Sequence, residues 1–274
     1  MAKVSAEAKR NYFDKIKAYK AEVEKMQSQE KAMLTELQKD DTGKAVQRLK
    51  LADESLNILS YYLFMNELSV AILGIKNEAY LNDARKACYK ALIYLEEIVS
   101  NHIDVPFSDY EDRLLEIKSI PVNEKWDLIR KLGFSIQSIE ESYGENTKWR
   151  WSFVELEARM ATVMKNMINL KRIVTDTDPR NDNYQIHTEH VRLAKELMQI
   201  AADGYRQKYE LSTHRQDDFK IAISYLSSLR RLHIILGESE QSDALKKKIE
   251  IWKTKMETDS KNREKKEKQA RRLR

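Results

Sequence analysis

Two histidines on one predicted helix are the residues whose spacing comes nearest to a metal site. His187 and His190 lie three residues apart, so a helix would place both imidazole rings on one face. Di-iron sites in helix bundles also need a glutamate three residues before a histidine. None of the five histidines has a glutamate at that position, so we interpret the pair as surface or boundary residues and predict no metal site.

The segment 175–183 offers oxygen ligands of the kind that Ca²⁺ accepts. Its carboxylate and amide side chains belong to Asp176, Asp178, Asn181, Asp182 and Asn183. An EF-hand loop needs glycine at its sixth position and a bidentate glutamate at its twelfth. Counted from Asp176, those positions hold Asn181 and His187. We therefore interpret the segment as helix-capping and turn residues rather than as a calcium loop.

Phosphate binding and nucleophilic catalysis also lack their usual patterns. The six glycines are scattered along the chain, so they form no glycine-rich phosphate loop. Cys88 lies beside Ala87 and Ala91 in an apolar helical pattern, and neither it nor any serine stands in a catalytic signature. We therefore predict that the protein is not an enzyme and has no catalytic, cofactor-binding or metal-binding residues.

The segment 148–153 is the first candidate for binding a partner. Trp149 and Trp151 flank Arg150, and tryptophan and arginine contribute most to binding at protein interfaces. Large aromatic side chains also fill gaps where two groups of helices join. We favour this second interpretation and keep Trp149, Arg150 and Trp151 as partner-binding candidates.

The C-terminal segment 253–274 is the second candidate. It holds ten lysines and arginines against four acidic residues, a charge of +6, so the rest of the chain sums to −1. It has neither the interleaved aromatic residues that favour nucleic-acid binding nor the apolar face that a membrane-bound helix needs. We therefore expect a solvated or protein-binding helix, with no nucleic-acid partner and no membrane contact. Its candidate contact residues are Lys265, Lys266, Lys268, Arg271 and Arg272.

Helical periodicity decides the fold class. Only three prolines and six glycines interrupt the chain, and 34% of its residues are charged, as on solvated helix faces. Within 5–39, apolar side chains recur at alternating steps of four and three, which is typical of a helix packed along a narrow seam. The seam consists of Tyr12, Ile16, Tyr19, Val23, Met26, Met33 and Leu37, with Glu30 in the missing place.

The sequence therefore predicts an all-α protein, an elongated, bent bundle of long antiparallel helices. We expect the seam of the first helix to pack within the chain's own bundle. Glu30 should mark a place where this packing loosens or a partner enters.

Turn and capping residues divide the rest of the chain into further helices. After a turn at 40–43 we expect long helices at 44–73, 77–102, 124–143, 153–174, 184–211 and 217–236, and a last one from about 240. Gly74 and Gly237 should end two of them. Two capping boxes, Ser108 with Glu111 and Ser152 with Glu155, and a cap at Asn123 should begin others. The most apolar stretch, 56–73, contains polar residues and is interpreted as a buried helix rather than a membrane span.

These breaks predict four segments. A long-helix bundle at 1–103 is followed by short connecting helices and a bend at 104–147, a second bundle at 148–252 and a basic helical tail at 253–274. The segment 144–148 is a second expected joint. The chain starts with a polar helix and no apolar leader.

Three stretches of the C-terminal half resemble helical proteins of spirochaetes. They read KWRWSFVELEARMATV at 148–163, AADGYRQKYEL at 201–211 and ISYLSSLRRLH at 223–233. Among such proteins the chain is most similar to the flagellar-coiling proteins of the Leptospira flagellar sheath. The resemblance implies a non-enzymatic protein that coats one side of the flagellar filament, promotes its curvature and so supports motility. It implies a periplasmic location if a leader has been removed, and otherwise we expect a cytoplasmic one.

Two classes of function remain open from the sequence. The first is a structural or assembly protein, most simply a filament coat component whose partners are other protein subunits of a larger assembly. The second is a peripheral membrane-binding or scaffold adaptor built from long helices, similar to BAR-type dimers or helical repeats. The helix pair at 217–252 favours a repeat, whereas no 34-residue self-similarity is present.

Overall fold

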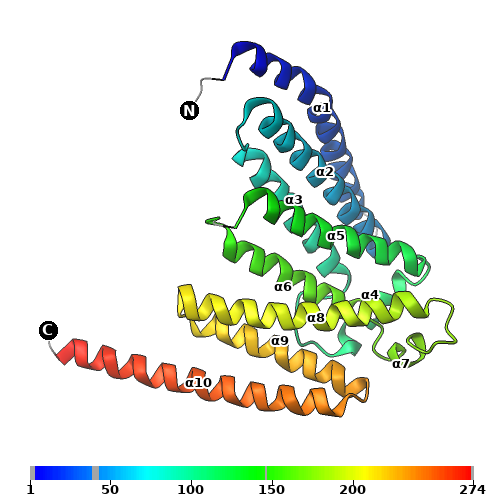
Figure 1. Ribbon diagram of the computed structural model, residues 1–274. Helices are drawn as coiled ribbons and strands as arrows, with labels where there is room; N and C mark the ends of the chain where they lie inside the picture. Colours follow the sequence, from blue (N-terminus) through cyan, green and yellow to red (C-terminus); the bar gives the residue numbers. More distant parts are fainter. Residues whose placement is uncertain (1–3, 39–42, 146, 273–274) are drawn as a thin grey trace. The chain divides into compact units, whose positions relative to one another are not determined.

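The computed structural model describes residues 4–38, 43–145 and 147–272, with backbone alone at 266–268 and 270–272. Every regular element in these residues is helical and none is a strand, which confirms the all-α class (Figure 1). The turn expected at 40–43 lies, except for Gly43, outside the described residues.

The chain divides into two compact units. The first comprises residues 1–101 and 107–167, and the second comprises 102–106 and 168–274. The first unit contains α1 (Ala6–Leu37), α2 (Lys44–Leu73), α3 (Glu78–Ile98), η1 (Phe107–Asp109), α4 (Glu111–Glu116), α5 (Val122–Tyr143) and α6 (Arg150–Asn166). The second contains α7 (Ile173–Asp176), α8 (Tyr184–Lys208), the π-helix η2 (Tyr209–Thr213), α9 (Gln216–Ile235) and α10 (Ser239–Arg272).

The boundaries of these two units differ from the boundaries of the four predicted segments. Helix α6, which the sequence placed in a second bundle starting at 148, packs against α3 and α5 of the first unit. The expected joint at 144–148 is the turn between α5 and α6 within that unit. The basic tail at 253–274 continues α10 without a break through Arg272.

Glycines and an asparagine fix the ends of α2 and α3. Gly43 and Gly74 take left-handed backbone conformations at φ 68° and 67°, on either side of α2. The Asn77 side chain then accepts hydrogen bonds from the backbone N–H groups of Ala79 and Tyr80 and caps α3. The predicted end of α2 at Gly74 is confirmed.

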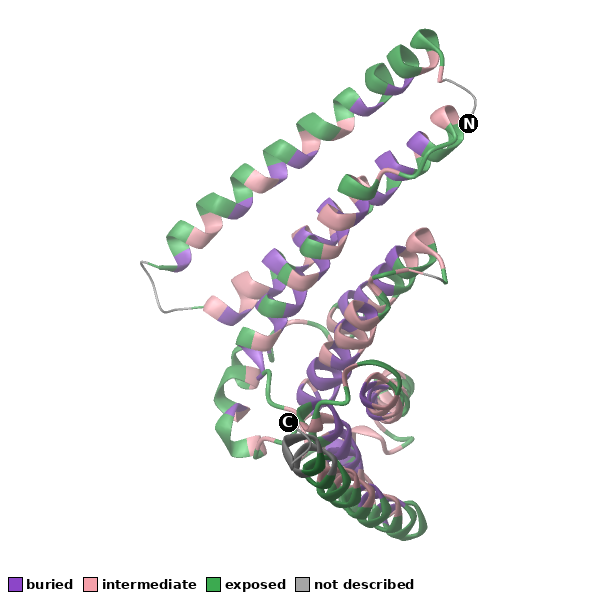
Figure 2. Cartoon of the chain, turned by 90° about the vertical axis from the view of Figure 1, so that its left-hand side faces the viewer, coloured by how far each residue is buried: buried purple, intermediate pink, exposed green. Residues whose placement is uncertain are grey.

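The seam of α1 faces its own unit. Five apolar side chains of the seam are buried in the first unit, where α1 packs mainly against α2. They are Tyr12, Ile16, Val23, Met26 and Leu37. In Figure 2 these buried positions recur along one side of α1, while its other side is exposed. The seam is therefore satisfied within the chain, as the sequence predicted.

The prediction that packing loosens, or that a partner enters, at Glu30 is wrong. Its carboxylate is 4% exposed and accepts hydrogen bonds from the Lys90 ammonium at 2.7 and 3.0 Å and from the Tyr94 hydroxyl at 2.7 Å. A buried carboxylate is tolerated when a cation and a hydrogen-bond donor neutralise it. The place expected to loosen is therefore closed by a polar contact between α1 and α3.

Helix α2 is the one described helix that is long and apolar enough to cross a membrane by length and composition. Buried core helices meet the same criteria. Here α2 packs against α1, α3, α4 and α5, and 39% of its most apolar window is buried.

The helix starts predicted from the two capping boxes and from the cap at Asn123 are wrong. Ser108 lies in η1, and α4 begins after Tyr110, which makes no side-chain cap. Asn123 lies inside α5, which begins after Pro121, because proline suits a helix start without needing a partner for its missing N–H. Ser152 lies inside α6, where its hydroxyl bonds across to α3 instead of capping its own helix.

Three predicted helices are shorter than expected. The helix predicted at 77–102 ends at Ile98. The helix predicted at 153–174 ends at Asn166, whose side chain donates to the Ser100 carbonyl at 3.0 Å. Asn169 then forms a turn by accepting from the Lys171 N–H at 3.1 Å, so the short α7 is separate. The helix predicted at 184–211 changes from α to π geometry at Tyr209.

Gly237 ends α9 as the sequence predicted. Its φ is 73°, and its N–H donates to the Ile234 carbonyl while the Glu238 N–H donates to the His233 carbonyl. These two bonds form a Schellman motif, which requires a residue that tolerates the left-handed conformation.

Candidate partner-binding sites

The predicted aromatic site lies at the start of α6, in the first unit. Trp149 and Trp151 are half-buried and Arg150 is exposed. The Arg85 guanidinium of α3 lies 3.9 Å from the centre of the Trp149 ring, and that of Arg150 lies 5.1 Å from the centre of the Trp151 ring. Cations over ring faces attract the aromatic quadrupole, so part of each tryptophan is already in contact within the unit.

Arg85 connects this aromatic segment to α3. Its guanidinium donates to the Ser152 hydroxyl at 3.1 Å and to the Asn82 side chain at 2.8 Å. Tyr89, one turn further along α3, exchanges a hydrogen bond of 2.9 Å with the same Ser152 hydroxyl. The tryptophans therefore help to hold α6 on α3. The sequence suggested a joint between lobes, whereas these contacts lie inside one unit.

The predicted basic site lies at the far end of α10, in the second unit. Leu245, Ile249 and Trp252 are buried, and all the side chains described beyond Ser260 are exposed. We call residues 261–272 of α10 the basic arm, and Figure 1 shows them running on beyond α9. Of the predicted contact residues, Lys265 is exposed, and the side chains of Lys266, Lys268, Arg271 and Arg272 lie outside the described residues.

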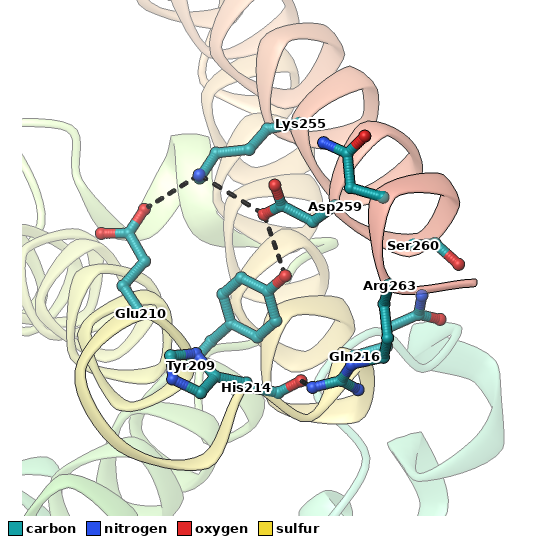
Figure 3. A pocket seen from close by; sticks show the side chains of 9 residues that line it. Tyr209, Glu210, His214, Gln216, Lys255, Asp259, Ser260 and Arg263 are labelled. Atoms are coloured by element: carbon teal, nitrogen blue, oxygen red, sulfur yellow. Dashed lines mark hydrogen bonds and ion pairs between the residues drawn. The ribbon is translucent and has the colours of Figure 1, made fainter. Parts of the chain in front are cut away.

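A polar cluster at the base of the basic arm was not predicted. Figure 3 shows it around an open hollow of about 620 Å³ between η2 and α10. The Tyr209 hydroxyl donates to Asp259 at 2.9 Å, and the Arg263 guanidinium donates to the His214 carbonyl at 2.9 Å. Lys255 lies 3.4 Å from Asp259 and 3.9 Å from Glu210. We call this cluster the arm base. It consists of Tyr209, Glu210, His214, Lys255, Asp259 and Arg263.

The π-helix positions Tyr209 for this contact. Its wider turn ends at His214, which has a left-handed φ of 50° that is uncommon outside glycine. Thr213 donates to the buried Asp218 of α9 at 2.6 Å and so fixes the end of the turn. The Tyr209 ring stacks on Phe219 with 4.8 Å between ring centres. No pattern in 209–214 indicated this geometry, because a π-turn needs no special residue at its start.

The protonation of Tyr209 suits a structural role. Burial, and then its hydrogen bond to the Asp259 carboxylate, raise the pKa of Tyr209 to about 12. The phenol therefore keeps its proton near neutral pH and remains a donor to Asp259. The arm base is thus a network of hydrogen bonds and ion pairs that sets where the basic arm begins.

The loop residues that were considered as metal ligands form turns instead. Across the described part of the chain, no three His, Cys, Asp or Glu side chains are grouped so as to hold a metal ion. Asp178 accepts from the Arg180 N–H at 2.9 Å, and Asn181 accepts from the Asn183 N–H at 2.9 Å. These are turn contacts within the loop. Asn183 precedes α8 without a side-chain cap, so turn formation rather than capping accounts for the loop.

Cys88 is fully buried, and burial raises the pKa of its thiol to about 12. A thiol with such a pKa stays protonated and is a poor nucleophile. It packs as a small core residue of α3.

Comparison with known proteins gives a family for the chain. A search of curated proteins and a search of solved structures gave no match. A family that is named after a Treponema protein, and is thus associated with spirochaetes, matches residues 8–260. This match covers α2 to α9 in full and most of α1 and α10. The chain therefore belongs to the TP0443 family.

Proposed function

We propose that this chain is a non-enzymatic assembly protein that binds other protein subunits, with the basic arm as one contact surface. The observation that carries the proposal is the length of α10, which has 34 residues, whereas α9, the helix it packs against, has 20. At about 1.5 Å per residue, the part of α10 beyond its last buried residue extends about 30 Å. Beyond Arg263, the side chains of α10 that the structure describes are all exposed, so this part of the helix offers its surface to a partner.

The arm can remain helical without a covering element. Lys255 and Asp259 form an ion pair of 3.4 Å across one helical turn, and the sequence places Glu257 and Lys261 at the same spacing. Such pairs stabilise a solvated helix by about 0.2–0.5 kcal/mol each. A stiff charged helix suits lateral contact between subunits.

We further propose that the assembly is the coat of a spirochaete flagellar filament and that the protein acts in the periplasm. The association of the family with spirochaetes and the resemblance to flagellar-coiling proteins support this assignment. Filament or sheath subunits would then be the partners. Contacts on one side of a filament only would shorten or lengthen that side and so favour curvature.

Fractionation of the source cells tests the assignment. We expect the chain to copurify with isolated filaments and to be lost from the corresponding fraction of cells without flagella. Lys261→Glu with Lys265→Glu should reduce the amount bound to filaments, because both lysines are exposed on the arm. The matched control, Lys17→Glu with Lys20→Glu, reverses two exposed lysines of α1. A purely cytosolic chain would exclude the coat assignment.

A peripheral membrane-binding adaptor is the second candidate. The excess of positive charge in 253–274 favours it, since basic segments are attracted to anionic lipid surfaces. Cosedimentation with phosphatidylserine vesicles separates the two candidates. Salt-sensitive binding that the Lys261 and Lys265 reversal removes would favour the adaptor.

A further inference from the structure

Four cationic side chains line a groove between α9 and α10. Its volume is about 270 Å³, and we call it the α9–α10 groove (labelled helices in Figure 1). Arg230 and Arg231 line it from α9, and Lys246 and Lys253 line it from α10. One carboxylate, that of Glu250, lies among these four cations.

Most of these cations have no acidic partner. Arg231 is paired, with its guanidinium 2.9 Å from Asp104. The other three cations, Arg230, Lys246 and Lys253, make no ion pair with any residue that the structure describes, and neither does Glu250. The Nε of Arg230 is also buried without a hydrogen-bond partner. A buried donor without an acceptor loses its contact with water and gains nothing in return.

Several nearby lysines of the same unit do have acidic partners. Lys248, two residues after Lys246, lies 3.2 Å from Asp203, and Lys195 lies 2.8 Å from Glu238. Lys255, two residues after Lys253, lies 3.4 Å from Asp259. Three cations without an ion pair thus line the groove, whereas several neighbouring lysines of α8 and α10 are paired.

The groove also has an apolar part. Ile249 is buried on its α10 side, and Ile234 of α9 is 53% exposed. Free phosphate or another small anion would gain nothing from an aliphatic neighbour. A protein segment that carries carboxylates beside an aliphatic side chain would use both parts of the groove.

We propose that the α9–α10 groove binds an acidic segment of a partner protein through its carboxylates. A guanidinium presents N–H groups as a fork that matches the two oxygens of a carboxylate, so Arg230 would donate the terminal N–H groups of its guanidinium to the partner. Lys246 and Lys253 would add charge on the α10 side. The proposal rests on the proposed function, since it gives the chemistry of a protein partner.

Binding of fluorescently labelled poly-L-glutamate to the full chain, measured by anisotropy at low salt, tests the groove. Lys246→Glu should weaken binding by about tenfold, because it replaces an attraction by a repulsion inside the groove. Lys247→Glu is the matched control, since Lys247 is exposed on the next position of α10 and does not line the groove. It should weaken binding by less than about twofold.

Two further variants test the roles of Glu250 and Arg230. Glu250→Gln should strengthen binding by about twofold or more, because among the residues that the structure describes it removes the one carboxylate that lines the groove. Arg230→Lys keeps the charge but removes the forked guanidinium, and it should still weaken binding. Its melting temperature is measured alongside, and a folded Arg230→Lys chain with unchanged affinity would contradict the proposed role of Arg230.

Equal losses for Lys246→Glu and Lys247→Glu would overturn the proposal, because binding would then follow total charge. Binding to phosphatidylserine vesicles that depends on Lys246, without such dependence for poly-L-glutamate, would overturn it in favour of a lipid. The binding role of the groove and the assignment to a filament coat can be contradicted independently. A cytosolic chain whose poly-L-glutamate binding depends on Lys246 would retain the groove, and a filament-bound chain without that dependence would retain the coat.

Discussion

The first and last long helices of the chain are similar in length and differ in what covers them. Helix α1 has 32 residues and is buried along one side from Tyr12 to Leu37, whereas α10 has 34 residues and its last buried residue is Trp252. The partner of α1, helix α2, has 30 residues, and the partner of α10, helix α9, has 20. A seam is therefore buried only as far as its partner extends.

The same contrast holds for the acidic residues of the two helices. Glu30 of α1 is enclosed by Lys90 and Tyr94, whereas Asp259 of α10 meets Tyr209 and Lys255 at an open hollow. An enclosed carboxylate depends wholly on its partners, while an open one can exchange them for water. The two helices should accordingly respond to mutation very differently.

Replacing Trp252 by alanine should give the largest loss. The side chain is 3% exposed, and its ring lies 5.7 Å from that of Phe219 between α9 and α10. Removing a buried tryptophan costs about 3–5 kcal/mol of unfolding free energy. Urea unfolding followed by circular dichroism measures the change. The control is Ile251→Ala, which removes a side chain that is 66% exposed and should change the free energy by less than about 0.5 kcal/mol.

Replacing Glu30 by alanine should cost about 2 kcal/mol, because hydrogen bonds to a buried charged group are lost and the Tyr94 hydroxyl loses its acceptor. Lys90 is half-exposed and can return to water, which keeps the cost below that of a fully buried pair. The same unfolding experiment on Glu24→Ala, an exposed position of α1, supplies the control. Equal effects of the two substitutions would contradict the enclosed contact.

These residues also show how far the sequence predicts the fold. The spacing from Tyr12 to Leu37 predicted both the helix and its buried side, because apolar periodicity follows directly from helix geometry. It could not predict that Glu30 is buried, since its partners lie on α3, about sixty residues away.

The candidate sites were less predictable than the helices. The charge of the basic tail was evident from composition, and its continuous helix through Arg272 followed from the absence of breakers. The arm base was not predicted, because it depends on a π-turn that places Tyr209 opposite Asp259. The capping boxes at Ser108 and Ser152 failed because serine bonds equally well to a neighbouring residue or helix.

Tyr209→Phe should have a smaller effect, about 1 kcal/mol, since it removes one hydrogen bond at the arm base and leaves the ring stacked on Phe219. Because the pKa of Tyr209 is raised from 10.0 to about 12, its stabilising contribution is complete below pH 10 and is lost as the pH rises towards 12. Urea unfolding at pH 8 and pH 11 should therefore show a smaller difference between the two chains at pH 11. A difference that grows with pH would contradict the direction of this shift.

Removing the end of α10 should change the unfolding free energy least of all, whereas removing the start of α1 should not be tolerated as well. A chain that ends at Arg263 lacks the eleven residues 264–274 and retains the whole arm base. The side chains described in that part are exposed, so its unfolding free energy should stay within about 0.5 kcal/mol of the full chain. A chain that begins at Phe13 loses a similar length of α1 together with the buried Tyr12, and its loss should exceed 1 kcal/mol, a rough lower bound. If the truncation after Arg263 proved the more costly, the arm would be covered by another part of the protein, and α1 and α10 would be alike in their packing.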